Sequence, residues 1–215
     1  MAVTGSELVA QALGRHGVEA FFFIMGAPMM GVEKACITAG MRGIDVRHEQ
    51  GAAMMAHAYA RVSRKTGVCM ACSGPGTVNI ASGLATAFID CAPVLALGGS
   101  SAWGEWGTGS FQEIDQVAIM RPLTKWAERC YETRRIPEII DKAIRMAWSG
   151  KPGPVYVDLP ADVLLGSVDE ATVVWPQAPS PRSARAMADG DAVDAAVKLL
   201  SEAKKPVVLS ASDVI

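Results

Sequence analysis

The chain has 215 residues, half of them apolar and only 20% of them charged, with a formal net charge of −2. This composition supports a buried core, excludes intrinsic disorder, and gives no reason to expect a nucleic acid partner. No apolar run reaches the roughly 18 residues that a membrane-spanning helix needs. The five scattered cysteines and an N-terminus without a signal-peptide pattern predict a reduced, cytoplasmic protein without a membrane partner.

Helical and strand patterns alternate along the chain up to about residue 160. The first helix is predicted to start at Thr4, because Glu7 follows it as in a capping box, and to end at Gly17. Further helices are predicted over 29–39, 50–64, 77–89, 114–120 and 136–148. Strands are predicted over 20–25, 44–47, 68–72, 93–97, 124–129 and 155–159. This order predicts an α/β fold: a doubly wound, mainly parallel six-stranded sheet with helices on both faces.

The composition changes after the last of these strands. Residues 1–165 are predicted to form the first domain, and the Pro-, Ser- and Ala-containing stretch 166–190 a linker. A helix over 192–203 and a strand over 206–210 predict the incomplete beginning of a central domain in 191–215. We therefore expect the chain to be part of a longer protein.

Residues 98–109 form a long predicted connection that contains Trp103 and Trp106. Connections of this length are often functional. Two interpretations remain open for the tryptophans: a surface for a partner or ligand, or a loop packed against its own domain.

Three short patterns do not develop into known motifs. His48 and Glu49 begin a zinc-protease motif, but Ala52 stands where its second histidine is needed, so zinc is excluded. Cys69 and Cys72 have redox-motif spacing, but they belong to a predicted strand and are expected to be core cysteines. The glycines of residues 74–76 lack the rest of a dinucleotide-binding fingerprint.

Polar residues stand at predicted junctions between strands and helices. Glu49 follows the strand 44–47, and a Ser-Gly-Pro-Gly turn begins at residue 73, after the strand 68–72. The carboxyl ends of parallel strands share one edge of the sheet, where α/β proteins bind ligands. Glu49 is therefore the first candidate for a chemical role.

Four ordered segments resemble the N-terminal, pyrimidine-binding domain of thiamine-diphosphate enzymes of the acetolactate synthase group, over about residues 4–165. They are Arg-His-Glu-Gln at 47–50, Ser-Gly-Pro-Gly-x-x-Asn at 73–79, Phe-Gln-Glu-x-Asp-Gln at 111–116, and Gly-x-Pro-Gly-Pro-Val-x-Val-Asp-Leu-Pro at 150–160. Residues 97–101 and 109–113 look closest to the 2-hydroxyacyl-CoA lyase and oxalyl-CoA decarboxylase branch. Acetolactate synthases share much of this pattern, so that branch stays an alternative.

The resemblance assigns expected roles to individual residues. Glu49 would be the catalytic acid that hydrogen-bonds N1′ of the cofactor's aminopyrimidine, and Gln112 would face the reacting carbon. The expected cofactor-binding residues are Gly26, Ala27, Pro28, Glu49, Pro75 and Asn79. The expected substrate pocket contains Ala27, Phe111 and Gln112.

The resemblance also implies groups that the chain does not hold by itself. Thiamine diphosphate is the expected cofactor, with Mg²⁺ bound by residues outside this segment, because the Gly-Asp-Gly…Asn motif for the metal and diphosphate is missing. A second full-length copy, in a homodimer or homotetramer, would supply the pyrophosphate-binding domain, so the chain carries half an active site. The expected reaction makes or breaks a carbon–carbon bond of a 2-keto acid or a 2-hydroxy- or 2-oxoacyl-CoA. The alternative of another class is a non-catalytic subunit or assembly domain.

Overall fold

The structure, a computed structural model, describes residues 1–177 and 187–211. Thr4 caps helix α1 (Gly5–Arg15): its hydroxyl accepts a hydrogen bond from Glu7 N, and the Glu7 carboxylate accepts one from Thr4 N. The predicted capping box is therefore confirmed. Gly17 follows the helix with φ of +69°, a left-handed conformation that favours glycine.

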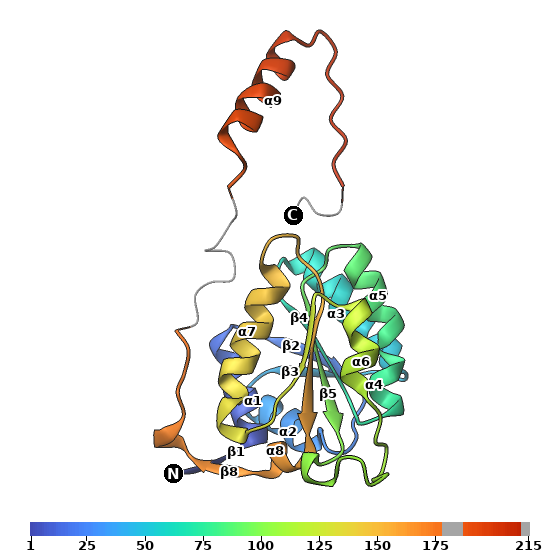
Figure 1. Ribbon diagram of the computed structural model, residues 1–215, viewed down its shortest axis with the longest axis vertical. Helices are drawn as coiled ribbons and strands as arrows, with labels where there is room; N and C mark the ends of the chain where they lie inside the picture. The colour runs from blue at the N-terminus through green and yellow to red at the C-terminus, as the bar shows by residue number, and fades with distance from the viewer. Residues whose placement is uncertain (178–186, 212–215) are drawn as a thin grey trace.

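Six parallel strands form the central sheet in the order β3-β2-β4-β5-β7-β6 (Figure 1). Their bounds are β2 (Ala20–Phe23), β3 (Arg42–Asp45), β4 (Gly67–Ala71), β5 (Val94–Ser100), β6 (Trp126–Arg129) and β7 (Val155–Pro160). The predicted doubly wound, six-stranded fold is confirmed. The strand order reverses at β2, because β3 lies on one side of it and the later strands on the other.

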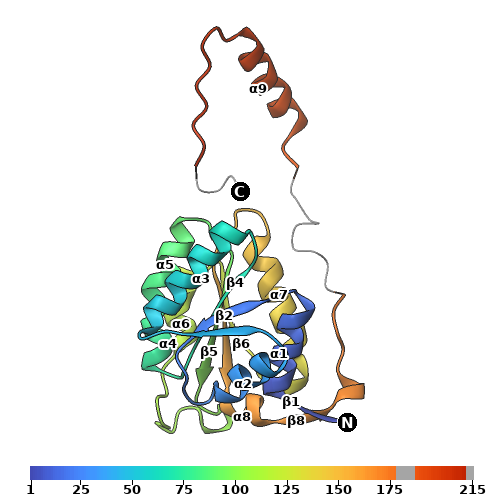
Figure 2. The same ribbon diagram turned by 180° about the vertical axis from the view of Figure 1, so that it is seen from behind.

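Helices cover both faces of the sheet, as Figures 1 and 2 show from opposite sides. The helices after α1 are α2 (Met30–Thr38), α3 (Glu49–Ser63), α4 (Pro75–Asn79), α5 (Ala81–Ile89), α6 (Gln116–Met120), α7 (Ile136–Trp148), α8 (Ala161–Leu165) and α9 (Gly190–Glu202). Side chains of α1, α2 and α7 join one buried cluster, and those of α3, α5 and α6 join another.

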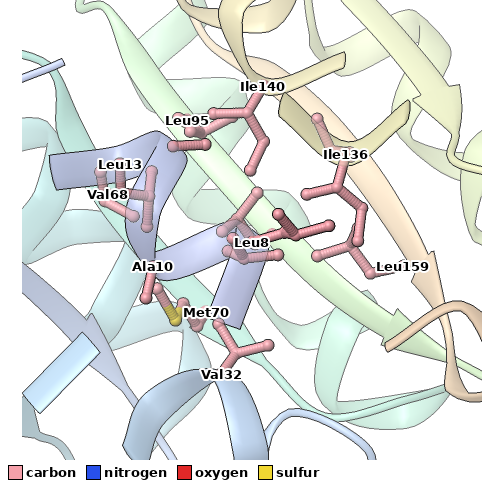
Figure 3. Close-up of a cluster of buried hydrophobic side chains, with 14 of the residues drawn as sticks. Leu8, Ala10, Leu13, Val32, Val68, Met70, Leu95, Ile136, Ile140 and Leu159 are labelled. Carbon is pink, nitrogen blue, oxygen red and sulfur yellow. The ribbon is translucent and has the colours of Figure 1, made fainter. Parts of the chain in front are cut away.

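Alternating strand residues divide between these two clusters. In β4, Val68 and Met70 face α1, whereas Cys69 faces α3. Figure 3 shows Leu8 of α1 and Ile140 of α7 among the side chains of the first cluster. Burying each such leucine or isoleucine contributes roughly 1.5–3 kcal/mol to the stability of the fold, so the helices on both faces stabilise the sheet.

Strand β5 is longer than the sequence predicts. The prediction that residues 98–109 form a connection is wrong for 98–100, which complete β5. A Cβ atom at Gly98 would lie 2.4 Å from the Tyr156 hydroxyl oxygen, and one at Gly99 would lie 2.5 Å from Pro28 Cδ. The two glycines therefore serve close packing inside a strand, which a loop assignment based on glycine content overlooks.

Several further boundaries differ from the prediction by one or two residues, and two of these differences have a clear physical cause. The helix predicted over 77–89 starts at Pro75 and divides into α4 and α5 at Ile80, whose N–H bonds the carbonyl of Thr77 in a tighter turn. The strand predicted over 44–47 lies two residues earlier, because β3 pairs with β2 from Arg42 onward. Glu49 remains just beyond this strand, as the first residue of α3.

The expected linker begins with ordered structure. Strand β8 (Ser167–Asp169) pairs antiparallel with β1 (Ala2–Thr4), so the first residues of the predicted linker are attached to the start of the chain. The cause is pairing across the length of the domain, which local composition does not reveal. Residues 178–186 of the predicted linker lie outside the described residues.

The helix predicted over 192–203 is confirmed as α9, and all of its side chains are exposed. The strand predicted over 206–210 is wrong, since these residues form no strand in the described part of the chain. A strand needs a neighbour for its hydrogen bonds, and the apolar run alone does not supply one. The division of the chain near residues 165 and 190 stays a prediction.

Candidate functional site

The carboxyl ends of β2 and β4 lie at the point where the strand order reverses. The chain leaves β2 toward the α1 face and leaves β4 toward the α3 face, and ligands of α/β sheets bind between such diverging connections. The two connections touch, because the N–H of Ser73 donates to the carbonyl of Ala27 at 3.2 Å.

Glu49 lies at this edge, in the first turn of α3. His48 caps the helix, and its Nδ1 accepts a hydrogen bond from Gln50 N at 3.1 Å. The half-buried Glu49 carboxylate accepts a hydrogen bond at Oε2 from Asn79 Nδ2, at 3.0 Å. Its Oε1 receives no hydrogen bond from the residues that the structure describes. The structure thus brings Glu49 and Asn79 together and leaves one carboxylate oxygen available to a ligand.

Gly76 allows the backbone to approach this carboxylate, and Gly26 allows it to approach the neighbouring Cys72. A Cβ atom at Gly76 would lie 2.4 Å from Cys72 Sγ and 3.2 Å from Glu49 Oε1, and one at Gly26 would lie 2.5 Å from Cys72 Cβ. Cys72 lies beyond the end of β4 and is half-buried, unlike the fully buried Cys69. Burial first, and then the charge of Glu49, raise the pKa of the Cys72 thiol, so the thiol is neutral at pH 7.

Gln112 is held in a left-handed backbone conformation, with φ of +58°. The Ser73 hydroxyl donates to Gln112 Oε1 at 2.6 Å. Gly74 packs on Gln112 with φ of +60°, and a Cβ atom there would lie 2.6 Å from the Gln112 carbonyl oxygen. A left-handed residue with a side chain costs roughly 1–2 kcal/mol, and such strain is concentrated at functional sites.

The other predicted residues lie around the same edge, with different exposure. Ala27 and Pro75 are exposed, and Pro28 is half-buried against Gly99. The Phe111 side chain is 80% exposed beside Gln112. Their roles toward a cofactor and a substrate stay predictions.

Sequence reasoning missed a buried polar network behind the site. Gln116, fully buried in α6, accepts a hydrogen bond from Gly74 N at 2.5 Å through Oε1. Its Nε2 donates to Asp158 Oδ1 at 2.7 Å and to the carbonyl of Gly99 at 2.9 Å. Gln116 therefore fixes the turn that carries Gly74. The signal was Asp158, an acid inside an apolar strand, because a buried acid requires partners.

The network continues from Asp158 to the long loop. Arg129, 5% exposed, donates from Nε to Asp158 Oδ2 at 2.5 Å. Its guanidinium lies 3.9 Å from the ring centre of Trp106 and 5.1 Å from that of Trp103. Asp162 also accepts a hydrogen bond from Trp103 N at 2.9 Å. Of the two interpretations of this loop, packing on its own domain is the one that these contacts support.

The described residues, 1–177 and 187–211, contain no group of three or more His, Cys, Asp or Glu side chains that could hold a metal ion. Within the same ranges, no helix is long and apolar enough to cross a membrane.

Fold and site together define a doubly wound α/β ligand-binding domain with a carboxylate–amide pair where its strand order reverses. The family model "Thiamine pyrophosphate enzyme, N-terminal TPP binding domain" matches residues 3–119. This is more than half of the 215 residues, and the chain belongs to that family.

Relatives of two activities are similar to this chain. It is 39% identical over 211 residues to acetolactate synthase isozyme 3 large subunit of Escherichia coli, covering 96% of this chain and 36% of that protein. It is 35% identical over 209 residues to 2-hydroxyacyl-CoA lyase 1 of Mus musculus, with 96% and 36% covered. The chloroplastic acetolactate synthase of Arabidopsis thaliana is 38% identical over 209 residues, with 95% and 31% covered. The chain thus spans about a third of the length of these relatives.

Proposed function

We propose that this chain supplies the pyrimidine-binding half of the active site of a thiamine-diphosphate-dependent enzyme. The enzyme would cleave or form a carbon–carbon bond next to a carbonyl group. The observation that carries the proposal is the Glu49–Asn79 pair at the carboxyl edge of the sheet, in a chain of this family.

The residues at this edge suit an aminopyrimidine. Glu49 Oε1 is an acceptor without a partner among the described residues, and Gly76 beside it carries no side chain that would block a ligand. Ala27 and Pro75 offer small, exposed surfaces without charge. When bound, thiamine diphosphate supplies the carbanion chemistry. A bound ring would also remove water from Glu49, and burial favours the neutral carboxyl form that can share its proton with N1′.

The residues of the candidate site have separate tasks in this proposal. Asn79 orients the carboxyl group of Glu49 by holding Oε2, which leaves Oε1 for N1′. Ser73 occupies Oε1 of Gln112, so the Nε2 donor of Gln112 is directed to a carbonyl oxygen of the substrate or to a water molecule. Phe111, exposed beside Gln112, would form a wall of the substrate pocket together with Ala27.

The relatives leave two substrate classes in competition. We propose an activity most like 2-hydroxyacyl-CoA lyase or oxalyl-CoA decarboxylase, on a 2-hydroxy- or 2-oxoacyl-CoA. The alternative is a carboligase of 2-keto acids like acetolactate synthase. Cleavage of a 2-hydroxyacyl-CoA without consumption of pyruvate would support the first class, and the reverse result the second.

The proposal includes groups beyond this chain. Mg²⁺ and the diphosphate would be held by a pyrophosphate-binding domain of a second copy, in a cytoplasmic homodimer or homotetramer. This arrangement agrees with the half-buried state of Glu49, because a second copy that covers the carboxyl group would exclude water from it.

The proposal is tested in the full-length protein by exchange of the cofactor's C2 proton for deuterium, followed by NMR. Glu49→Gln removes the carboxyl proton, and exchange should fall by about 10²–10⁴-fold. Glu19→Gln serves as the matched control, because Glu19 precedes β2 at the opposite end of the sheet and pairs with Lys65. Exchange in this control should stay at the wild-type rate.

Near-normal exchange in Glu49→Gln would contradict the assignment of Glu49 as the acid that activates the cofactor. Calorimetry with thiamine diphosphate and Mg²⁺ separates the non-catalytic alternative. No binding heat from the full-length protein would favour an assembly domain, which needs no acid at this edge.

A further inference from the structure

A second glutamate lies buried close to the proposed site. Glu33, in the first turn of α2, is 3% exposed, and neither of its carboxyl oxygens has a hydrogen-bond partner in the described residues. A buried carboxylate without partners costs far more than a neutral carboxylic acid at the same place. The chain therefore keeps a proton on Glu33 over a wide pH range. Burial, and then the nearby charge of Asp45, raise the pKa of Glu33 to about 8.

Among the described residues, no cation forms an ion pair with Glu33. Lys34 of α2 and Arg42 of β3 are exposed, and Arg47 binds Asp45. Asp45 at the end of β3 is negative, and the thiols of Cys36 and Cys72 are neutral because their pKa values are raised. Helix α1 also packs on α2, but its charged groups have other partners. Glu7 binds Thr4, Arg15 lies over Trp175, and His16 contacts Asp141.

Backbone hydrogen bonds connect Glu33 to the candidate site. Glu33 N donates to the carbonyl of Met29 at 3.0 Å, and Met29 N donates to the carbonyl of Gly26 at 2.8 Å. Cys72 in turn contacts the backbone of Gly26 and Gly76, at the close approaches given above. Glu33 is therefore linked through Met29 to Gly26, which packs on Cys72 as Gly76 does beside Glu49. Helix α2 also begins two residues after Pro28, so a shift of Glu33 would move the connection at the cofactor edge.

We propose that Glu33 is a positioning residue for the pyrimidine site, which is intact while Glu33 is a neutral carboxylic acid and is disrupted when Glu33 ionises. Loss of the proton leaves a buried charge that only water can solvate. Helix α2 must then move to admit water, and Gly26, which packs on Cys72, moves with it. The inference rests on the proposed function for its effect on the cofactor. The ionisation of Glu33 itself does not depend on that function.

The effect on stability has a definite sign. The pKa of Glu33 rises from an ordinary 4.5 to about 8 on folding, so the folded state binds the proton more tightly. The stabilisation from this proton is complete below pH 4.5, declines as the pH rises toward about 8, and is then lost. Glu33→Gln, which is neutral at every pH, should not show this decline.

The first experiment uses full-length protein without cofactor. An infrared band of a protonated carboxyl group should disappear with a midpoint near pH 8 in the wild type and should be missing from Glu33→Gln. The unfolding temperature of the wild type should decrease between about pH 4.5 and pH 8, while that of Glu33→Gln stays more nearly level. Glu19→Gln, an exposed acid, is the control and should titrate like the wild type.

A second variant makes the test independent of the folding of Glu33→Gln. Asp45→Asn removes the charge that raises the pKa of Glu33, so the midpoint should move to lower pH. The shift should be about half a pH unit or less, because Asp45 is exposed and screened. A midpoint that does not move, or that rises, would contradict the assignment to Glu33.

The cofactor readout is the deuterium exchange at C2, compared at pH 7 and pH 9. The wild type should lose at least about fivefold of its exchange rate at pH 9, and Glu33→Gln less than about twofold. Equal losses in both proteins would overturn the positioning role. Absence of exchange at every pH would instead refute the proposed function, while the infrared titration would still report on Glu33.

Discussion

Two polar regions lie at the carboxyl edge of the same sheet, and they differ in how deeply their groups are buried. In the network of Gln116, Asp158 and Arg129, the side chains are nearly or fully buried and joined by short hydrogen bonds, although Arg129 Nη2 has no partner among the described residues. In the candidate site, Glu49 is half-buried, Asn79 is exposed, and one carboxylate oxygen is left without a partner among the described residues.

This difference indicates that the first region supports the fold and that the second can bind a ligand. A buried polar group contributes to stability only when its partners are present, so the network belongs to the folding of the chain itself. A half-buried acid with an available oxygen contributes little to folding and can serve a ligand instead. The two regions meet at Gly74, whose N–H binds Gln116 and whose backbone packs on Gln112. The network thus holds the turn on which the candidate site is built.

The largest expected effect tests the network. Asp158→Ala leaves the guanidinium of Arg129 buried without its carboxylate, which should cost about 3–5 kcal/mol of stability. Denaturant unfolding of the full-length protein, followed by tryptophan fluorescence, measures the loss, because Trp103 and Trp106 lie over Arg129. A loss below about 1 kcal/mol would show that the network is not a structural support.

A smaller effect compares two glutamines four residues apart. Gln116→Ala leaves Gly74 N and Asp158 short of partners and should destabilise the protein by about 2–3 kcal/mol. Gln112→Ala should change stability by no more than about 1 kcal/mol, because its side chain makes one hydrogen bond at a half-buried position. Equal losses in the two variants would remove the distinction between the regions.

The smallest effect concerns Glu49. Although Glu49→Gln should abolish most of the C2 exchange, we expect its free energy of unfolding without cofactor to change by less than about 1 kcal/mol. The same unfolding measurement provides the test. A loss of several kcal/mol would mean that Glu49 supports the fold, and the exchange result would then no longer isolate a chemical role.

Local patterns predicted most of the fold. The capping box at Thr4, the helix 136–148 and the six strands of the central sheet follow from spacing that each segment carries by itself. The errors fall where distant segments decide the structure. Residues 98–100 extend a strand because Tyr156 and Pro28 pack on glycine, and β8 forms because β1 lies beside it. Residues 206–210 have a strand pattern but form no strand in the described part of the chain.

The candidate site was predictable to a different extent for each residue. Glu49 stood at a recognisable junction, and the structure places Asn79 against it although 30 residues separate them. The left-handed conformation of Gln112 and the burial of Glu33 were not predictable, because both depend on what packs around them.

The sequence by itself determined the alternation of helices and strands, the parallel sheet, and the presence of an acid just beyond β3. These features follow from periodicity and from the chemistry of single residues. Only the tertiary structure decided which polar residues are satisfied and which remain available to a ligand. Pairing, burial and backbone strain depend on atoms brought together from distant parts of the chain, as at Gly74, Gln112 and Gln116.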